Sequence, residues 1–399
     1  MGEGLKVWSA RGSAVVIGAL AVVACGPESA PPAWVARTDT IADTVVVHTV
    51  SGSVWGDSVR VVETLAIGGL DGPDEVLFGE VFRMAEDLEG GIYVFDRQGP
   101  VLRHYDGSGD YIGTLGRAGQ GPGEYSWMSL GMAVDPNGVL FLSDWGNGRV
   151  ARFAPYGEAL DPWPLTSGFF TTAPGPGVFT NGPGRVLVRA SVQERPGLIV
   201  MDAGVATDTL LVPELPGLPP ERGGPYRVDT YWDWTPDGHF VVGVSDSYSF
   251  EVHGPSGVTR VSRDVPGLPV HPDEAAAWTR RFQWMEGRPN YRPPEGEWLP
   301  SEMPPFRGLA AGSDGRVWVR RNVEPMAVEV DAPQGGPPPV GWTQPFVCDV
   351  FESDGTYLGE VRFPDRFEPH LFGAGHVWGV RRGDLDEEYV VRLELRGPR

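Results

Sequence analysis

The sequence has little basic charge and almost no lysine. Its 399 residues include 32 Lys and Arg against 53 Asp and Glu, which gives a formal net charge of −21, and Lys6 is the only lysine. Proteins that bind a phosphate backbone need a basic patch or stripe. The composition therefore excludes nucleic acid as a partner and favours an acidic, solvated surface.

The common motifs of catalysis are also missing. There is no G-x-S-x-G elbow, so serine hydrolysis has no anchor. The seven histidines show no metal-ligand spacing such as H-x-x-x-H. The glycines of GRAGQGPGEY, residues 116–125, lack the following helix and the Lys-Ser/Thr of a phosphate loop. No complete catalytic constellation is present, and we expect no cofactor.

The N-terminus has the parts of an export signal. Basic residues precede a short apolar core, Ser13–Ala24, which is too short to span a bilayer as a helix. The stretch VVAC, Val22–Cys25, resembles the lipobox of bacterial lipoproteins. That resemblance implies cleavage before Cys25 and a diacylglycerol group on its thiol. Gly26 follows instead of aspartate, and the sorting rule of that family then favours the outer membrane.

These features predict a lipoprotein signal peptide at residues 1–24 and a flexible tether at 25–43. We expect the mature protein to be lipid-anchored in the cell envelope, facing the periplasm or the exterior. Acylation would leave Cys348 without a partner, so the fold must be stable without a disulfide. Because residues 1–24 hold Lys6, Arg11 and Glu3, the mature chain would carry 30 basic and 52 acidic residues and a formal charge of −22.

A turn followed by an apolar run recurs six times. The copies are EGGIYVFD (89–96), PNGVLFLSD (136–144), GPGRVLVRA (182–190), PDGHFVVGVSD (236–246), SDGRVWVRR (313–321) and GAGHVWGVRR (373–382). Asn-Gly and Asp-Gly favour the positive φ angles of tight turns, and the β-branched and aromatic residues after them favour strands. Each copy therefore predicts a hairpin between an inner and a second strand.

Third and fourth strands follow most copies, as in PVLRHYDGSGDYIGTLG (100–116). Four strands repeated at intervals of about 45 to 75 residues are typical of propeller blades, which bury their apolar faces only against neighbouring blades. We predict an all-β fold, a six-bladed propeller over residues 44–399. The last copy lacks an outer strand, and DSVRVVETLAIGG (57–69) is predicted to supply it. This strand would close the ring and remove exposed sheet edges.

The second copy resembles the NHL-type repeat, whose usual form is strand, Asp, Asn, Arg, strand; Asp144, Asn147 and Arg149 occupy those places. GRAGQGPGEY looks like the glycine-rich link between blades of bacterial six-bladed propeller lipoproteins. IGGLDGPDEVLFG (67–79) resembles a degenerate copy of it. The resemblance covers most of residues 57–396. It implies a propeller and an envelope location, but no defined reaction.

Six-bladed propellers include metal-dependent lactonases, and Glu80 lies where the gluconolactonase-like family places its first metal ligand. That family also needs an Asn and an Asp on inner strands of later blades. The third inner strand offers Asn181 only at its turn, and the fifth has no carboxylate before Asp314. The residues therefore do not support a metal site. Asp233 is the other inner-strand acid, and we expect a structural carboxylate there.

One segment, HPDEAAAWTRRFQWMEGR (271–288), predicts a helix, because a proline and two acids stand at its start. Trp278, Phe282 and Met285 recur at helical spacing and are expected to pack on the propeller. The helix belongs to a helical and proline-rich insertion at 265–305, which links the fourth and fifth blades.

A second long loop, 322–344, joins the second and third strands of the fifth blade. The links from the outer strand of one blade to the inner strand of the next, and those from the second to the third strand of a blade, both lie on the face where the inner strands begin. The insertion 265–305, the loop 322–344 and the link 116–125 should therefore crowd one face. The first two should lie side by side over the fifth blade and form a partial cap above the channel.

Residues at the starts of inner strands would lie beneath this cap: Arg83, Trp127, Phe179, Tyr231, Trp232, Arg307 and His370. Arginine offers bidentate bonds and aromatic rings offer stacking area, which suits a carboxylate, a sugar or a peptide. The other interpretation is that these aromatic residues only plug the pore.

The leading hypothesis is a lipid-anchored propeller of the cell envelope that acts as a non-catalytic binding or scaffold module for a protein, peptide or glycan. The alternative is a metal-dependent, lactonase-like hydrolase or lyase at the central channel, with a divalent ion held by Glu80 and Asp233. A third hypothesis is an envelope assembly subunit without a small ligand.

Overall fold

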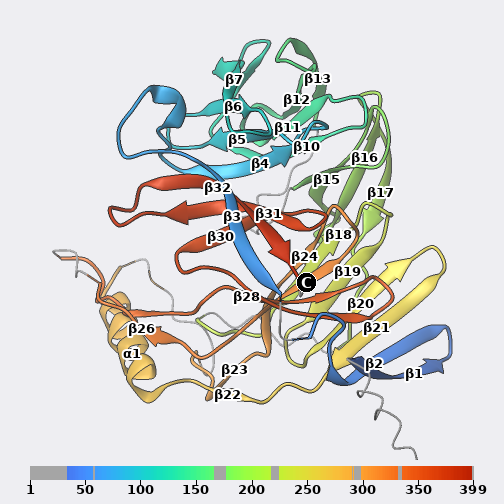
Figure 1. Cartoon of the computed structure of the whole chain (residues 1–399), viewed down its shortest axis with the longest axis vertical. Helices are drawn as coiled ribbons and strands as arrows, with labels where there is room; N and C mark the ends of the chain where they lie inside the picture. Colours follow the sequence, from blue (N-terminus) through green and yellow to red (C-terminus); the bar gives the residue numbers. More distant parts are fainter. Residues whose placement is uncertain are drawn as a thin grey trace, which may run out of the picture. The chain divides into compact units, whose positions relative to one another are not determined.

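Six sheets, each built on four antiparallel strands, form the blades of a six-bladed propeller (Figure 1). The computed structural model describes residues 34–56, 59–165, 177–216, 224–289, 291, 298–330 and 335–397. The predicted signal peptide, Cys25 and the first part of the tether lie outside the described residues. Within the described part of the chain, no helix is both long and apolar enough to cross a membrane.

The strands of each blade are given from the innermost to the outermost. Blade 1 contains β4 (Val81–Glu86), β5 (Ile92–Asp96), β6 (Val101–Tyr105) and β7 (Tyr111–Leu115). Blade 2 contains β10 (Ser129–Val134), β11 (Leu140–Asp144), β12 (Arg149–Phe153) and β13 (Ala159–Pro164). Blade 3 contains β14 (Val178–Thr180), β15 (Arg185–Val192), β16 (Arg195–Asp202) and β17 (Val205–Leu211).

The other three blades complete the ring. Blade 4 contains β18 (Thr230–Trp234), β19 (Phe240–Val244), β20 (Ser249–Gly254) and β21 (Gly257–Arg263). Blade 5 contains β24 (Phe306–Ala311), β25 (Val317–Arg321), β28 (Val347–Phe351) and β29 (Tyr357–Arg362). Blade 6 contains β30 (Phe367–Phe372), β31 (His376–Arg382), β32 (Glu388–Arg396) and β3 (Arg60–Ile67).

The six sequence repeats are confirmed as the hairpins that lead into the second strand of each blade. In every copy the glycine before that strand takes a positive φ: Gly90, Gly138, Gly184, Gly238, Gly315 and Gly375. A residue with a Cβ is disfavoured in this conformation, so the turn position itself requires glycine. Asp135 shows how such a turn is fixed, because its Oδ1 accepts hydrogen bonds from the N–H groups of Asn137 and Val139.

The predicted closure of the ring is also confirmed. Strand β3 pairs antiparallel with β32, from Arg60 opposite Arg396 to Ile67 opposite Val390. Figure 1 shows this as a blue strand lying beside a red one, since the two come from opposite ends of the sequence. The fourth strand of the last blade is thus supplied by the N-terminal part of the chain.

The core consists of six hydrophobic clusters, and each lies between two neighbouring blades. The cluster between blades 6 and 1 contains Ile67 of the closing strand together with Val81 and Trp378. No blade buries both of its faces alone, so the stability of each depends on its neighbours. The described residues form one compact unit for this reason.

Residues 34–43, which the sequence analysis placed in the tether, instead belong to a β-hairpin. Strand β1 (Trp34–Ile41) pairs with β2 (Thr44–Gly52), and β2 pairs in parallel with β21, so blade 4 has six strands. Val47 is buried, which explains why this segment joins the sheet. The new edge, β1, is polar and exposed over most of its length, and polar edges discourage further pairing.

The predicted helix is confirmed as α1 (Pro272–Glu286). His271 caps it, because its Nδ1 accepts a hydrogen bond from the N–H of Asp273 at 3.2 Å. The short strands β22 (Leu268–Pro269), β23 (Glu302–Met303), β26 (Met326–Ala327) and β27 (Trp342–Thr343) lie in the same two long segments. Figure 1 shows α1 and β26 on one side of the molecule, near β22 and β23.

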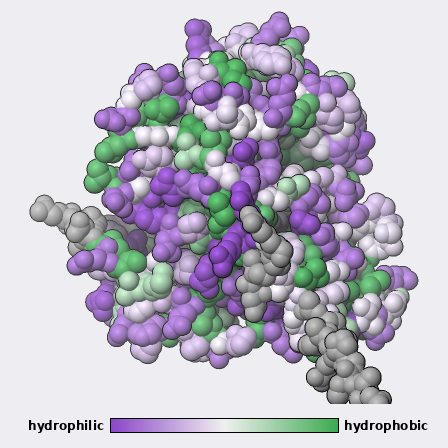
Figure 2. Space-filling view, viewed as in Figure 1, coloured by the Kyte–Doolittle hydropathy of each residue, from purple (hydrophilic) through white to green (hydrophobic). Residues whose placement is uncertain are grey.

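The surface carries mixed polar and apolar side chains. On the face seen in Figure 2, hydrophilic residues surround smaller groups of hydrophobic ones. Exposed large apolar residues such as Ile41, Leu88, Tyr156 and Leu385 come from distant parts of the sequence. Scattered exposed apolar side chains are normal for a protein surface.

Candidate functional site

Asp233, on the inner strand β18, joins three blades at the central channel. Its Oδ1 accepts a hydrogen bond from Arg189 Nη2 on β15 at 2.6 Å, and its Oδ2 accepts one from the N–H of Ala311 on β24 at 2.8 Å. Burial raises the pKa of Asp233, while the charge of Arg189 and the backbone donors oppose that rise. Asp233 thus has the bonding of a structural carboxylate that ties blades 3, 4 and 5 together.

Arg83, on β4, makes a similar link between blades 1 and 2. Its side chain is buried, Nε donates to the carbonyl of Leu130 at 2.7 Å, and the guanidinium lies 4.0 Å from the ring centroid of Phe82. Burial, together with the positive charges of Arg189 and Arg97, lowers the pKa of Arg83 to about 10. The backbone carbonyl therefore stabilises a charge that burial and its neighbours disfavour.

The six inner strands enclose a mainly apolar cavity of about 220 Å³. Phe179 and His370, two of the predicted ligand-binding residues, line it together with Asp233. Burial, with the charges of Arg83 and Arg382, lowers the pKa of His370 to about 3. His370 is therefore neutral near neutral pH.

The two residues considered for a metal are not brought together in this cavity. Glu80 forms an ion pair with Arg97 and does not line the cavity, whereas Asp233 lines it and is bonded to Arg189. Within the described ranges, no group of three or more His, Cys, Asp and Glu side chains could hold a metal ion. The geometry therefore gives Glu80 and Asp233 separate ion-pair partners.

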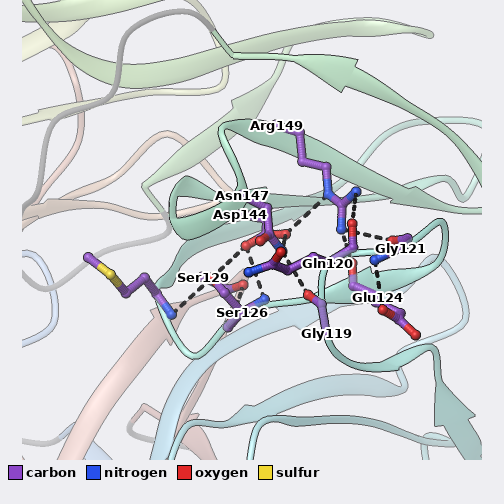
Figure 3. A network of polar contacts seen from close by, with 10 residues as sticks. Gly119, Gln120, Gly121, Glu124, Ser126, Ser129, Asp144, Asn147 and Arg149 are labelled. Carbon is purple, nitrogen blue, oxygen red and sulfur yellow. Dashed lines mark hydrogen bonds and ion pairs between the residues drawn. The ribbon is translucent and has the colours of Figure 1, made fainter.

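Blade 2 shows what the Asp, Asn and Arg of its repeat do (Figure 3). Asp144 accepts hydrogen bonds from Asn147 Nδ2 at 2.7 Å and from Arg149 Nε at 3.3 Å. Arg149 Nη2 donates to the carbonyls of Gly121 at 2.9 Å and Glu124 at 2.8 Å. The three side chains brace the glycine-rich link 116–125 on the face where β10 begins.

The insertion 265–305 and the loop 322–344 lie side by side, as predicted, and we call them together the cap. Arg281 of α1 donates to the carbonyl of Pro338, and the rings of His271 and Trp342 lie 4.7 Å apart. Gln344 Nε2 lies 3.3 Å from the sulfur of Met303. At the start of the loop, Asn322 Nδ2 donates to the carbonyl of Pro304 at 2.7 Å, so both ends of the loop contact the insertion and the cap is one packed structure.

A pocket of about 410 Å³, which we call the cap pocket, lies between the cap and the beginnings of the inner strands of blades 4 and 5. Its aromatic lining residues are Tyr226, Tyr231, Trp278 and Trp342. Two of its arginines, Arg307 and Arg320, come from the start of β24 and from β25. Neither forms a hydrogen bond or an ion pair within the described part of the chain, although Arg320 lies 3.9 Å from the ring centroid of Phe346.

The two arginines are electrostatically unfavourable neighbours. Burial, followed by the positive charge of Arg307, lowers the pKa of Arg320 to about 10. An anion between them would relieve both effects, because it would replace lost hydration and cancel the repulsion.

Two buried acceptors also line the cap pocket. Glu274 is 1% exposed, and its Oε1 accepts a hydrogen bond from the hydroxyl of Tyr226 at 2.5 Å. Its Oε2 has no partner among the described residues, and the same is true of Asn322 Oδ1. Buried acceptors without a donor are uncommon in folded proteins and cost free energy.

The seven predicted ligand-binding residues therefore do not form one site. Tyr231 and Arg307 line the cap pocket, whereas Phe179 and His370 line the central cavity. Arg83 and Trp232 pack among channel arginines: the guanidinium of Arg189 lies 4.0 Å from the ring centroid of Trp232. Trp127 follows the link 116–125, is 54% exposed, and lines neither the central cavity nor the cap pocket.

Sequence reasoning missed Arg189, Arg320 and Glu274. A charged residue inside an apolar strand, as Arg189 is in RVLVRASV, signals a buried partner. The pair Arg320 and Arg321 at the end of β25 carried a weaker signal, since only the fold shows which one faces the pocket.

No family model matches this chain, and neither does any curated relative. Among solved structures it is similar to a member of the DUF4221 family from Bacteroides vulgatus, at 12% sequence identity and a TM-score of 0.55, over 86% of this chain and 99% of that one. It is also similar to a putative exported protein from Bacteroides fragilis, at 11% identity and a TM-score of 0.47, over 90% and 99%. A streptogramin B lyase matches at 13% identity and a TM-score of 0.40, over 86% and 100%. At this level of identity, the likeness to the Bacteroides vulgatus protein shows that the two share a fold.

Proposed function

We propose that this protein is a lipid-anchored propeller of the cell envelope that acts as a non-catalytic binding or scaffold module for a protein, a peptide or a glycan. The observation that carries the proposal is the cap pocket, which combines aromatic walls with two arginines, Arg307 and Arg320, that form no hydrogen bond or ion pair in the described chain. Aromatic residues and arginine are the side chains most enriched at binding hot spots.

The envelope location is proposed on the sequence. A signal peptide at residues 1–24 and a lipidated Cys25 would place the propeller at the outer membrane. The kinship of its blades with NHL-type repeats is proposed on Asp144, Asn147 and Arg149, whose hydrogen bonds brace the link between blades 1 and 2. Cys25→Ser should abolish palmitate labelling and release the protein from membranes; a variant that still labels would refute the anchor.

A second candidate, a metal-dependent hydrolase or lyase, rests on the central cavity that Asp233 and His370 line. The ion pair of Asp233 with Arg189 counts against it, because a metal would have to displace a bonded guanidinium. Metal analysis of the purified full-length protein separates the two candidates. A stoichiometric divalent ion that only a chelator removes would favour the enzyme.

The binding proposal is tested by capture from native membranes. Full-length protein with an affinity tag should retain a partner, and a Trp278→Ala/Trp342→Ala variant should lose it, since both rings line the cap pocket. Tyr156→Ala is the matched control, because Tyr156 is an exposed aromatic residue on blade 2. Equal capture by all three proteins would place binding elsewhere, and no capture by any would refute a scaffold role.

A further inference from the structure

The cap pocket holds opposite charges that the protein itself does not pair. Arg307 and Arg320 supply guanidinium donors, and Glu274 supplies a carboxylate with one free oxygen. No ion pair joins Glu274 to either arginine in the described part of the chain, since none lies within 4.0 Å. The pocket therefore offers a place for an anion at the two arginines, whereas the partnerless oxygen of Glu274 is buried out of reach of a ligand.

Two arginines beside aromatic walls match a ligand that carries a carboxylate and apolar groups. We propose that the cap pocket binds the C-terminal carboxylate of a peptide through Arg307 and Arg320, with the aromatic residues of the pocket packing against the side chains of the peptide. This inference rests on the proposed function and names its ligand class. Guanidinium groups bind carboxylates in bidentate geometry, which a lysine could not reproduce.

The remaining walls favour a peptide over an acidic sugar. The pocket has four aromatic side chains, and the two acceptors without partners among the described residues, Glu274 Oε2 and Asn322 Oδ1, are buried too deeply to accept a hydrogen bond from a hydroxyl group of a sugar. A uronic acid would bring several hydroxyl groups, and each one left unpaired on burial would weaken binding. The end of a peptide brings one carboxylate, few N–H donors and an apolar side chain that can pack on the rings.

Calorimetric titration of the full-length protein tests the inference. The probes are the tripeptides Ala-Ala-Phe, Ala-Ala-Leu and Ala-Ala-Asp, each as the free acid and as the C-terminal amide, with glucuronate as the sugar acid. We expect at least one free acid to bind and its amide to bind about tenfold more weakly or worse, because charge-assisted bonds are lost. The double variant Arg307→Gln/Arg320→Gln should likewise weaken the binding of the free acid by about tenfold or more.

Arg362→Gln is the control, because Arg362 lies on the outer strand β29 of the same blade and is exposed. The inference is overturned if no free acid binds, if acid and amide bind equally, or if glucuronate binds more tightly than every peptide. Membrane capture with Arg307→Gln/Arg320→Gln separates this failure from that of the proposed function. If this variant retains a partner that Trp278→Ala/Trp342→Ala loses, the cap pocket still binds the partner, but the two arginines do not hold its carboxylate.

Discussion

The central channel and the cap pocket both contain arginines and aromatic rings, but they differ in how their charges are bonded. In the channel, Arg189 pairs with Asp233 at 2.6 Å and Arg83 donates to the carbonyl of Leu130 at 2.7 Å. In the cap pocket, Arg307 and Arg320 have no polar partner among the described residues.

This difference separates the side chains that hold the ring together from those available to a ligand. A buried charge with its bonds satisfied stabilises the arrangement that satisfies it, and removing its partner is costly. Arg307 is exposed and Arg320 lies against the ring of Phe346, so neither guanidinium group is used in a hydrogen bond or an ion pair of the described chain, and both keep donors for an anion. The comparison therefore predicts large stability effects in the channel and small ones in the cap.

The largest effect is expected from breaking the ring itself. Deletion of residues 57–69 removes β3, which pairs with β32 and places Ile67 in the cluster between blades 6 and 1. Domain stability is about 5–15 kcal/mol, and the loss of a whole strand should leave no cooperative unfolding transition in thermal denaturation. Replacing residues 335–341 of the cap by Gly-Gly should preserve the transition. An unchanged melting temperature after the β3 deletion would contradict ring closure.

The channel ion pair should give the next largest effect. Asp233→Ala leaves Arg189 buried without its carboxylate, which should lower the free energy of unfolding by about 3–5 kcal/mol. Arg307→Gln/Arg320→Gln should change it by no more than about 1 kcal/mol, because no hydrogen bond or ion pair of the described chain is lost, and the lost contact of Arg320 with Phe346 is offset by the relieved repulsion between the arginines. Urea denaturation measures both, and similar losses would abolish the distinction between channel and cap.

Arg149, outside the channel, is also an arginine whose hydrogen bonds are satisfied within the protein. Arg149→Gln removes donors to the carbonyls of Gly121 and Glu124, and we expect a loss of about 1–3 kcal/mol in unfolding free energy. Hydrogen exchange should show the opening concentrated in the link 116–125. Uniform opening of the whole protein would indicate that Arg149 is no local brace.

A further effect concerns the pH dependence of stability, and it grows as the pH falls below 6.5. The pKa of His370 is about 3 in the folded chain, because of burial and the charges of Arg83 and Arg382, against 6.5 as its ordinary value. Between these values the unfolded chain binds the extra proton, so this group lowers stability as the pH falls. His370→Asn should remove a slope of at most about 1.4 kcal/mol per pH unit, measured by urea denaturation from pH 7 to 4.

His376 provides a control of opposite sign. Its hydrogen bond to Glu86 is the main cause that raises the pKa of His376. Its contribution to stability is therefore present below pH 6.5 and is lost as the pH rises through the raised value. If His370→Asn and His376→Asn shifted the stability curve in the same direction, the assigned environments would be wrong.

The propeller could be predicted from sequence because its signals are local and repeated. Turn glycines and the apolar runs after them specify a hairpin without reference to the rest of the chain, and β3 was found because the last blade lacked a strand. The hairpin β1–β2 was missed, because its pairing with β21 joins segments about two hundred residues apart. A polar edge strand also has little apolar pattern to detect.

The candidate site was predicted only in part, because neighbouring blades complete it. The order of strands is enough to predict that the two cap segments lie side by side on the face where the inner strands begin. Which side chain meets which does not: Arg189 and Asp233 are 44 positions apart, and the cap pocket combines Glu274 with Arg320. The seven residues chosen from the starts of inner strands were therefore divided between the channel, the cap pocket and the surface.

The central claim, that the protein binds its partner at the cap pocket and not in the channel, is tested most directly by photocrosslinking in native membranes. Trp342 lines the cap pocket and Phe372 lines the central cavity, and each is replaced in turn by p-benzoylphenylalanine in the full-length chain. We predict a crosslinked adduct, identified by mass spectrometry, from position 342 and none from position 372. An adduct from position 372 alone would contradict the account and move function to the channel.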